Sequence, residues 1–207
     1  MALLMVHLLA AKRFAERHAK YLDDPDFYLG AISPDGIHVR DHDDKSNKDF
    51  IHLYNWKEPH PENVVAYWQE RATAFDIGYG VHVLTDGQWV RRYRALCPAL
   101  LLPDGRVDTK TYYHDTFLTD FILYGQDGQG AALFDLVARG SAPKDHPLLT
   151  FGELTEWRRM MLDAYQAGCR ETGEPVYLTP DYCRAFIEDC QPMMDETYAQ
   201  CFGGEDT

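Results

Sequence analysis

The sequence is poor in positive charge. Its 20 lysines and arginines are outnumbered by 33 aspartates and glutamates, which gives a formal net charge of −13. A protein that binds extended nucleic acid or an anionic membrane surface needs a basic face, so the composition disfavours both partners. An acidic chain is suited instead to binding cations.

Long apolar runs are absent as well. No stretch approaches the ~20 apolar residues that a membrane-spanning helix needs. Residues 1–11 are apolar enough to suggest a signal peptide, but they have no basic start and their periodicity continues to Phe14 and beyond. We therefore interpret them as a helix of the mature protein and expect a cytoplasmic protein without a membrane span.

Motifs of the common cofactor and nucleophile sites are also missing. The chain contains no HExxH, no P-loop, no Gly-x-Gly-x-x-Gly and no motif around a nucleophilic serine or cysteine. Its cysteines have no CxxC spacing, which predicts free thiols in a reducing compartment. They are Cys97, Cys169, Cys183, Cys190 and Cys201.

What the chain does contain is helical periodicity, and almost no strand signal. At 207 residues and 45% apolar content, it is expected to form a single domain over residues 1–207. Capping signals at Thr150 and Thr179 start two of the expected helices. We predict an all-α fold of about six or seven helices, with one long irregular loop from the thirties to the fifties.

The most informative stretch is residues 75–93. An apolar stripe at helical spacing runs through Phe75, Tyr79, His82, Asp86, Trp89 and Tyr93. Its two central members are polar and one turn apart, so both side chains could reach one point. Burying an ionised carboxylate requires a partner. A divalent metal and a simple His–Asp hydrogen bond explain the pair equally well.

Two further stripes carry a polar residue where an apolar one is expected. His7 lies in the stripe that runs from Leu4 to Tyr21, which also contains His18 near the helix end. A single core histidine is more often satisfied by a backbone carbonyl than by a metal. Asp120 interrupts a stripe of residues 113–124 that includes Tyr113, Phe117 and Tyr124. Its partner could be a metal or the second N–H of a ligand histidine.

The segment of residues 27–54 is too long and too polar for an ordinary connection. Pro34 and Gly36 form a turn that would aim the carboxylate of Asp35, and the segment closes on His52. We read the aspartates at 41, 43 and 44 as a solvated bend. The long loop is therefore expected to carry functional residues.

Together these positions form one candidate metal-binding set from separate segments. Three imidazoles with two or three carboxylates suit zinc, whereas Ca²⁺ and Mg²⁺ prefer oxygen ligands alone. More than four ligands indicate two or more ions, and such pairs catalyse the hydrolysis of phosphate esters. The set is His7, Asp35, His52, His82, Asp86 and Asp120.

These segments resemble the zinc-dependent phospholipase C family. The resemblance is carried by VHLLAAK, LGAISPD, FIHLY and GYGVHVLTDGQW, and it covers roughly residues 1–124. The most similar members are small bacterial ones, described as family proteins or hydrolases. That family and the related fungal single-strand-specific zinc nucleases are all-α metallohydrolases with up to three zinc ions. Residues 125–207 resemble no family.

The resemblance implies roles for individual residues. His82 and Asp86 match the family's His-x-x-x-Asp ligands, with Asp86 bridging two ions. Asp35 and His52 would complete one site, and His7 would join Asp86 on the second. The His-x-x-x-Glu pair of the family's third site is absent here, so we expect two zinc ions, with three as the upper limit.

The function implied is hydrolysis of a small phosphate ester, a phosphodiester or a phosphomonoester, by a metal-bound water. Asp35 would bind metal and could also orient that water as general base. One alternative is an HD-type phosphohydrolase built on His114-Asp115 or His42-Asp43, and another is a non-catalytic metal-binding protein. Whether His38 or His114 binds metal directly, and the oligomeric state, stay open.

Overall fold

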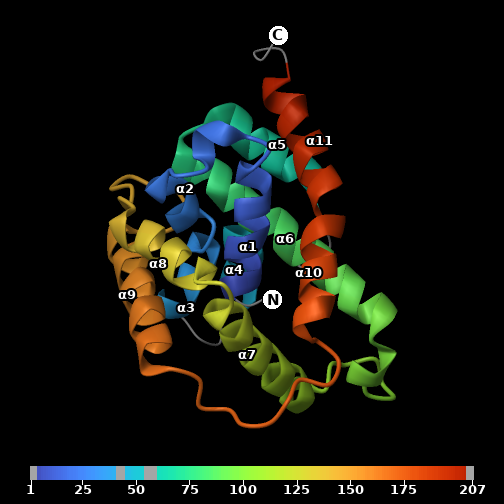
Figure 1. Cartoon of the computed structure of the whole chain (residues 1–207). Helices are drawn as coiled ribbons and strands as arrows, with labels where there is room; N and C mark the ends of the chain where they lie inside the picture. The colour runs from blue at the N-terminus through green and yellow to red at the C-terminus, as the bar shows by residue number, and fades with distance from the viewer. Residues whose placement is uncertain (1–3, 41–44, 54–59, 204–207) are drawn as a thin grey trace.

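The computed structural model describes residues 4–40, 45–53 and 60–203 (Figure 1). Within these ranges the chain is helical, and the one extended pairing is an isolated bridge between Leu101 and Val107. The predicted all-α fold is confirmed. In the same ranges, no helix has both the length and the apolar character needed to cross a membrane.

The helices are more numerous than predicted because several are short. In chain order they are α1 (Leu4–Ala15), η1 (Ala19–Tyr21), α2 (Pro25–Gly30), η2 (Ser33–Gly36), α3 (Ile37–Arg40), α4 (Lys45–Ile51), α5 (Pro61–Glu70), α6 (Ala74–Leu96), η3 (Pro98–Leu100), α7 (Thr109–Gly125), α8 (Gln129–Arg139), α9 (Phe151–Ala167), α10 (Pro180–Asp189) and α11 (Gln191–Phe202).

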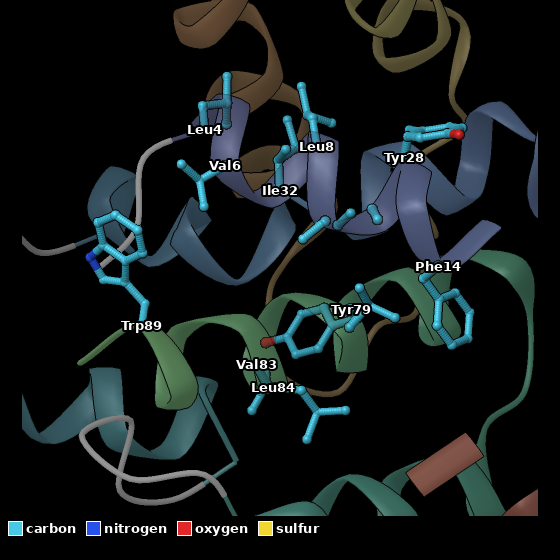
Figure 2. Close-up of a cluster of buried hydrophobic side chains, with 14 of the residues drawn as sticks. Leu4, Val6, Leu8, Phe14, Tyr28, Ile32, Tyr79, Val83, Leu84 and Trp89 are labelled. Carbon is cyan, nitrogen blue, oxygen red and sulfur yellow. The ribbon is translucent and has the colours of Figure 1, made fainter. Parts of the chain in front are cut away.

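Helix α6 is the central element, and α1 packs beside it. The stripe predicted on residues 75–93 lies on this one helix, and all six of its members are buried. Figure 2 shows Leu4 and Leu8 of α1 in one cluster with Tyr79 and Leu84 of α6. In Figure 1, α8 and α9 lie on one side of this pair, and α10 and α11 lie on the other.

The start of α6 is defined by a capping box. α5 ends at Glu70, and α6 begins after a capping box in which Thr73 and Asp76 exchange side-chain and backbone hydrogen bonds. Asp76 also accepts a hydrogen bond from the Tyr67 hydroxyl, at 2.8 Å. The capping box therefore separates α5 from α6, although the apolar periodicity of the sequence continues from one helix into the other.

Two glycines let α2 lie directly on α6. A Cβ atom on Gly78 would be 2.0 Å from the carbonyl oxygen of Phe27, and one on Gly30 would be 2.1 Å from that of Phe75. These separations are far below van der Waals contact, so only glycine fits at either position. The close approach brings the end of α2 and the turn after it against the polar centre of α6.

The segment expected as one irregular loop contains short helical pieces. η2 and α3 cover residues 33–40, and α4 covers residues 45–51. Pro34 occupies the first turn of η2, where a missing N–H has no cost. Turn signals thus fold this stretch into helical turns, and His52 follows the last of them directly.

The predicted inner face of α7 is wrong in part. Tyr113 and Phe117 are 47% and 44% exposed, whereas Asp120 is buried. The buried face of α7 instead carries Tyr112, Asp115, Thr116, Leu118, Thr119, Asp120 and Leu123. The buried face mixes polar and apolar residues. Its hydrophobic periodicity in the sequence is therefore weaker than that of the stripe formed by the exposed aromatic residues.

The two capping signals predicted for the C-terminal part are confirmed. Thr150 and Glu153 form the predicted capping box of α9, and Thr179 caps α10 ahead of Pro180. α10 ends at Asp189, and Pro192 stands in the first turn of α11. α11 packs against α1 and α5 and closes that side of the core.

Candidate metal centre

Four of the six predicted ligands converge on one point inside the protein. Asp35, His52, His82 and Asp86 are all buried, and each offers a ligand atom within 4.8 Å of the other three. They come from η2, from the residue after α4, and from one face of α6. This group could hold a metal ion.

His82 is oriented by the backbone at the end of α2. Its Nδ1 atom lies 2.8 Å from the carbonyl oxygen of Ala31. A carbonyl can only accept, so Nδ1 carries the proton and Nε2 presents a lone pair to the group. The glycine contact between α2 and α6 places Ala31 within reach.

His52 is fixed in the same way by its own helix. Its Nδ1 atom lies 3.1 Å from the carbonyl oxygen of Lys48, one turn earlier. The same reasoning puts the proton on Nδ1 and leaves the Nε2 lone pair facing the carboxylates. Both histidines therefore have the tautomer that metal-binding imidazoles adopt.

Asp35 is held in place by the turn that carries it. The Ser33 hydroxyl donates to the carbonyl oxygen of Leu29 at 2.7 Å, and the indole N–H of Trp157 donates to that of Ile32 at 2.8 Å. These bonds fix the backbone just before Asp35. Its carboxylate oxygens then lie 3.6 Å from His52 Nε2 and 3.9 Å from His82 Nε2.

Asp86 faces two histidines with its two oxygens. Oδ2 lies 3.5 Å from His52 Nε2, and Oδ1 lies 3.3 Å from His7 Nε2. The His7 ring stacks on the His82 ring, with centroids 3.7 Å apart and planes 7° apart. His7 thus stands next to the four-residue group on the far oxygen of Asp86, where a bridging carboxylate would have its second ion.

The ionisation states match those of metal ligands. Burial by itself raises the pKa of Asp35, but His52 and His82 in their protonated forms, together with Lys48, hold its pKa below the ordinary value. Asp86 is likewise held well below its ordinary pKa against the effect of burial, with His7 and His82 both contributing. Burial lowers the pKa of His82 to about 3, and the nearby His7 acts in the same direction.

These observations test whether the residues fit a metal. The Nε2 atoms of His52 and His82 and the Oδ1 atom of Asp35 have no hydrogen-bond partner among the described residues. With both Nδ1 atoms protonated, the Nε2 lone pairs of the two histidines face the lone pairs of the carboxylate oxygens, and a bound cation would satisfy both. Ligands ~2.0–2.2 Å from a tetrahedral zinc lie about 3.3–3.6 Å apart. The separations of His52 Nε2 from Asp86 and Asp35, 3.5 and 3.6 Å, have this spacing, and the 3.9 Å between His82 Nε2 and Asp35 is slightly longer.

Asp35 is the least buried of the four residues. The side chains of His52, His82 and Asp86 are 0% exposed, that of Asp35 is 7% exposed, and that of Lys48 is 13% exposed. The ammonium nitrogen of Lys48 lies 3.9 Å from Asp35 Oδ1. No motif in the sequence marks Lys48 as part of the site, although its position four residues before His52 places it one helical turn away.

His38 also lies beside Asp35. Its Nε2 atom lies 3.8 Å from Asp35 Oδ1, and its side chain is 28% exposed. It packs near the ring of Trp157, with centroids 6.0 Å apart. His38 is therefore a neighbour of the four-residue group and not a member of it.

Asp120 is placed apart from the four-residue group. Its Oδ1 atom accepts a hydrogen bond from the backbone N–H of Met5 at 2.9 Å, and its Oδ2 atom accepts one from the hydroxyl of Tyr165. Burial raises its pKa well above the ordinary value, against the effect of the N–H groups of Met5 and Val6. Asp120 thus caps the start of the helix that carries His7.

Of the two histidine–aspartate dipeptides, the structure describes His114-Asp115, and this one does not form a second centre. His114 faces the carbonyl oxygen of Thr172 at 3.3 Å and is partly exposed. Asp115 is buried and accepts backbone N–H bonds from Val176, Tyr177 and Leu178 at 3.0, 2.6 and 3.1 Å. The pair therefore anchors the connection between α9 and α10. His42 and Asp43 lie outside the described residues.

Comparisons with known proteins add no identification. No protein-family model matches the chain, and neither a curated protein nor a solved structure is significantly similar to it. The geometry of the site is therefore the basis for its function.

Proposed function

We propose that this protein is a metal-dependent hydrolase of phosphate esters, with zinc bound by Asp35, His52, His82 and Asp86. One observation carries the proposal. Two imidazoles, each with its proton directed to a backbone carbonyl, point their lone pairs at two ionised carboxylates inside the core. A purely structural His–Asp pair would place an N–H between nitrogen and oxygen, and here that proton is used elsewhere.

The donor set supports zinc over the other common divalent ions. Neutral imidazole nitrogens combined with carboxylate oxygens suit Zn²⁺, whereas Mg²⁺ and Ca²⁺ favour oxygen ligands. His7 and Asp86 would hold a second ion. The contact of 3.3 Å between His7 Nε2 and Asp86 Oδ1 supports this assignment.

The chemistry follows from the placement of Asp35. A bound zinc ion supplies Lewis acidity, lowering the pKa of water toward ~7 and neutralising charge on the phosphate. Asp35 is the most exposed of the four proposed ligands, and its carboxylate remains ionised. It is therefore the ligand best placed to accept a proton, while the other three ligands hold the site rigid.

The resemblance to the zinc-dependent phospholipase C family supports the same function. The residues that the resemblance assigns to one zinc ion are the four that converge in the structure. The substrate we propose is a small phosphate ester. A protein of the same fold that binds metal without turnover is the competing function, and the same experiment separates the two.

The decisive experiment measures metal content and turnover together. Protein purified without chelator is analysed for metal and then assayed with a panel of phosphomonoesters and phosphodiesters. We expect zinc at one to two equivalents and hydrolysis that a chelator removes and zinc restores. Zinc without turnover would favour a binding protein, and protein that takes up no zinc would refute the centre. His82→Phe, which keeps an aromatic ring in the core but removes a ligand, is the matched control.

A further inference from the structure

Lys48 brings a positive charge to the Asp35 side of the metal centre. Its ammonium nitrogen lies 3.9 Å from Asp35 Oδ1, the same oxygen that faces His52 Nε2 at 3.6 Å. Its backbone carbonyl accepts from the Nδ1–H of His52 at 3.1 Å. One residue therefore orients a proposed ligand through its backbone and approaches the centre through its side chain.

The formal charges show what this ammonium group could do. Asp35 and Asp86 carry one negative charge each, and a single divalent ion cancels both. The ammonium group of Lys48 lies beside Asp35, and its side chain is 13% exposed, more than that of any of the four proposed ligands. A phosphate group bound to the ion on the Asp35 side would therefore lie close to two cations.

We propose that Lys48 binds a non-bridging oxygen of the substrate's phosphate group and stabilises its negative charge during hydrolysis. The inference rests on the proposed function and adds a substrate-binding residue to it. Phosphoryl transfer is catalysed by positioning and by cations around the phosphate oxygens, and a lysine serves as a point charge for this purpose. Lys48 would thus supply positive charge to the phosphate group, as a further metal ion does in centres with more ions.

A different role for Lys48 makes different predictions. If the ammonium group served only to neutralise Asp35, its removal would strengthen zinc binding and leave phosphate binding unchanged. If it were needed to build the centre, its removal would reduce the zinc content. A phosphate-binding role predicts weaker phosphate binding at unchanged zinc content.

The test uses inorganic phosphate as the probe and binding as the readout. Full-length protein is loaded with zinc, freed of excess metal and titrated with phosphate by calorimetry, and its zinc content is measured before and after. Lys48→Met keeps the length of the side chain and removes the charge, whereas Lys48→Arg keeps the charge. Lys110→Met, at an exposed position in the first turn of α7, controls for the change in net charge.

We expect Lys48→Met to bind phosphate about 10- to 100-fold more weakly, the loss typical of one charge-assisted hydrogen bond. Lys48→Arg should recover most of the affinity, and Lys110→Met should match the unmodified protein. Equal phosphate affinity in Lys48→Met, loss of its zinc, or no phosphate binding by the unmodified protein would each overturn the inference.

The outcome is separable from that of the proposed function. Phosphate binding that depends on Lys48, in a protein that hydrolyses none of the esters, would retain the inference and refute the hydrolase. Hydrolysis of the esters by a protein whose phosphate affinity does not depend on Lys48 would support the hydrolase and refute the inference.

Discussion

The Nδ1 atom of His82 meets the carbonyl oxygen of Ala31 at 2.8 Å, and this contact joins the centre of α6 to the end of α2. It exists because Gly78, one helical turn before His82, has no side chain to hold α2 away. The same contact sets the tautomer of His82. A packing feature of the helix pair thereby decides which nitrogen faces the candidate metal.

Gly78→Ala should therefore weaken the metal centre, although Gly78 is not one of the proposed ligands. The added Cβ would stand 2.0 Å from the carbonyl oxygen of Phe27, so α2 must move. We expect a loss of about 1–3 kcal/mol in the free energy of unfolding, as for other overpacked cores. Zinc affinity should fall as well, because Ala31 moves away from His82. Urea unfolding and a zinc titration measure the two effects.

Gly152→Ala is the matched control for this variant. Gly152 lies in α9, where a Cβ would meet its nearest neighbour at 3.9 Å. The change should leave zinc affinity unaltered and raise stability by about 0.5–1 kcal/mol. Unaltered zinc affinity in Gly78→Ala would show that the Ala31 contact does not orient His82.

The all-α fold and the convergence of four residues could be predicted because the signals are local. The stripe on residues 75–93 places His82 and Asp86 on one face, and Pro34 with Gly36 marks the turn that carries Asp35. A polar residue at a position that the period assigns to the core is conspicuous. Its burial needs a partner, and that requirement can be stated from sequence alone.

The rest depends on contacts between distant segments, which periodicity does not encode. Asp120 was read as a possible ligand because it is polar in a helix, yet its partners are Met5 and Tyr165, from two other helices. The apolar character of Tyr113 and Phe117 predicts that both side chains face inward, but both are exposed. Lys48 could not be predicted as part of the site, because a lysine on a short helix carries no sequence signal of a site. Its role is visible only when the fold places Asp35 beside it.

Asp86→Ala should lower the metal content more than any other single substitution in the centre. Asp86 faces His52 with one oxygen and His7 with the other, so its loss removes the common carboxylate of both proposed sites. His52→Ala removes one ligand and should weaken metal binding less. Zinc stoichiometry by elemental analysis ranks the two variants.

His18→Ala is the control for these ligand substitutions. His18 stands at the end of α1, with its Nε2 atom 3.1 Å from Asp195 Oδ1. Its removal should leave the zinc content unchanged. Full zinc content in Asp86→Ala would contradict the whole centre, whatever the result for His52→Ala.

Asp120→Asn and Asp120→Ala should differ sharply. The pKa of this buried carboxyl lies well above the ordinary value, so the neutral amide is a close replacement and still offers an oxygen to the Met5 N–H. We expect Asp120→Asn to keep the zinc count and to lower affinity by no more than ~10–100-fold, as for an indirect role. Asp120→Ala should cost about 1–3 kcal/mol, because it leaves a buried N–H without a partner.

Zinc stoichiometry and urea unfolding of both variants test this assignment. Tyr165→Phe, which removes the hydroxyl that donates to Asp120 and keeps the ring, should also retain the zinc count. Loss of one zinc equivalent in Asp120→Asn would instead make Asp120 a direct ligand and would contradict its placement as a cap of α1.

His146 should make the protein sensitive to mild acid. Its Nδ1 atom accepts the backbone N–H groups of Leu148 and Leu149 at 3.4 and 3.3 Å, so Nε2 carries the proton and donates to the Tyr67 oxygen at 2.9 Å. The Tyr67 hydroxyl donates in turn to Asp76 at 2.8 Å. A proton on Nδ1 would break the two backbone bonds. Burial lowers the pKa of His146 to about 4, against an ordinary value of 6.5.

The sign of the effect follows from this lowered pKa. Between pH 6.5 and 4 the unfolded chain binds a proton at His146 that the folded chain does not, so stability falls as the pH falls. We expect a loss of about 2–3 kcal/mol over this range from His146, and His82, whose pKa is also lowered, acts in the same direction. Urea unfolding of chelator-treated protein at several pH values should therefore give a shallower pH dependence for His146→Gln. Parallel curves for the two proteins would show that the folded state accommodates a charged His146.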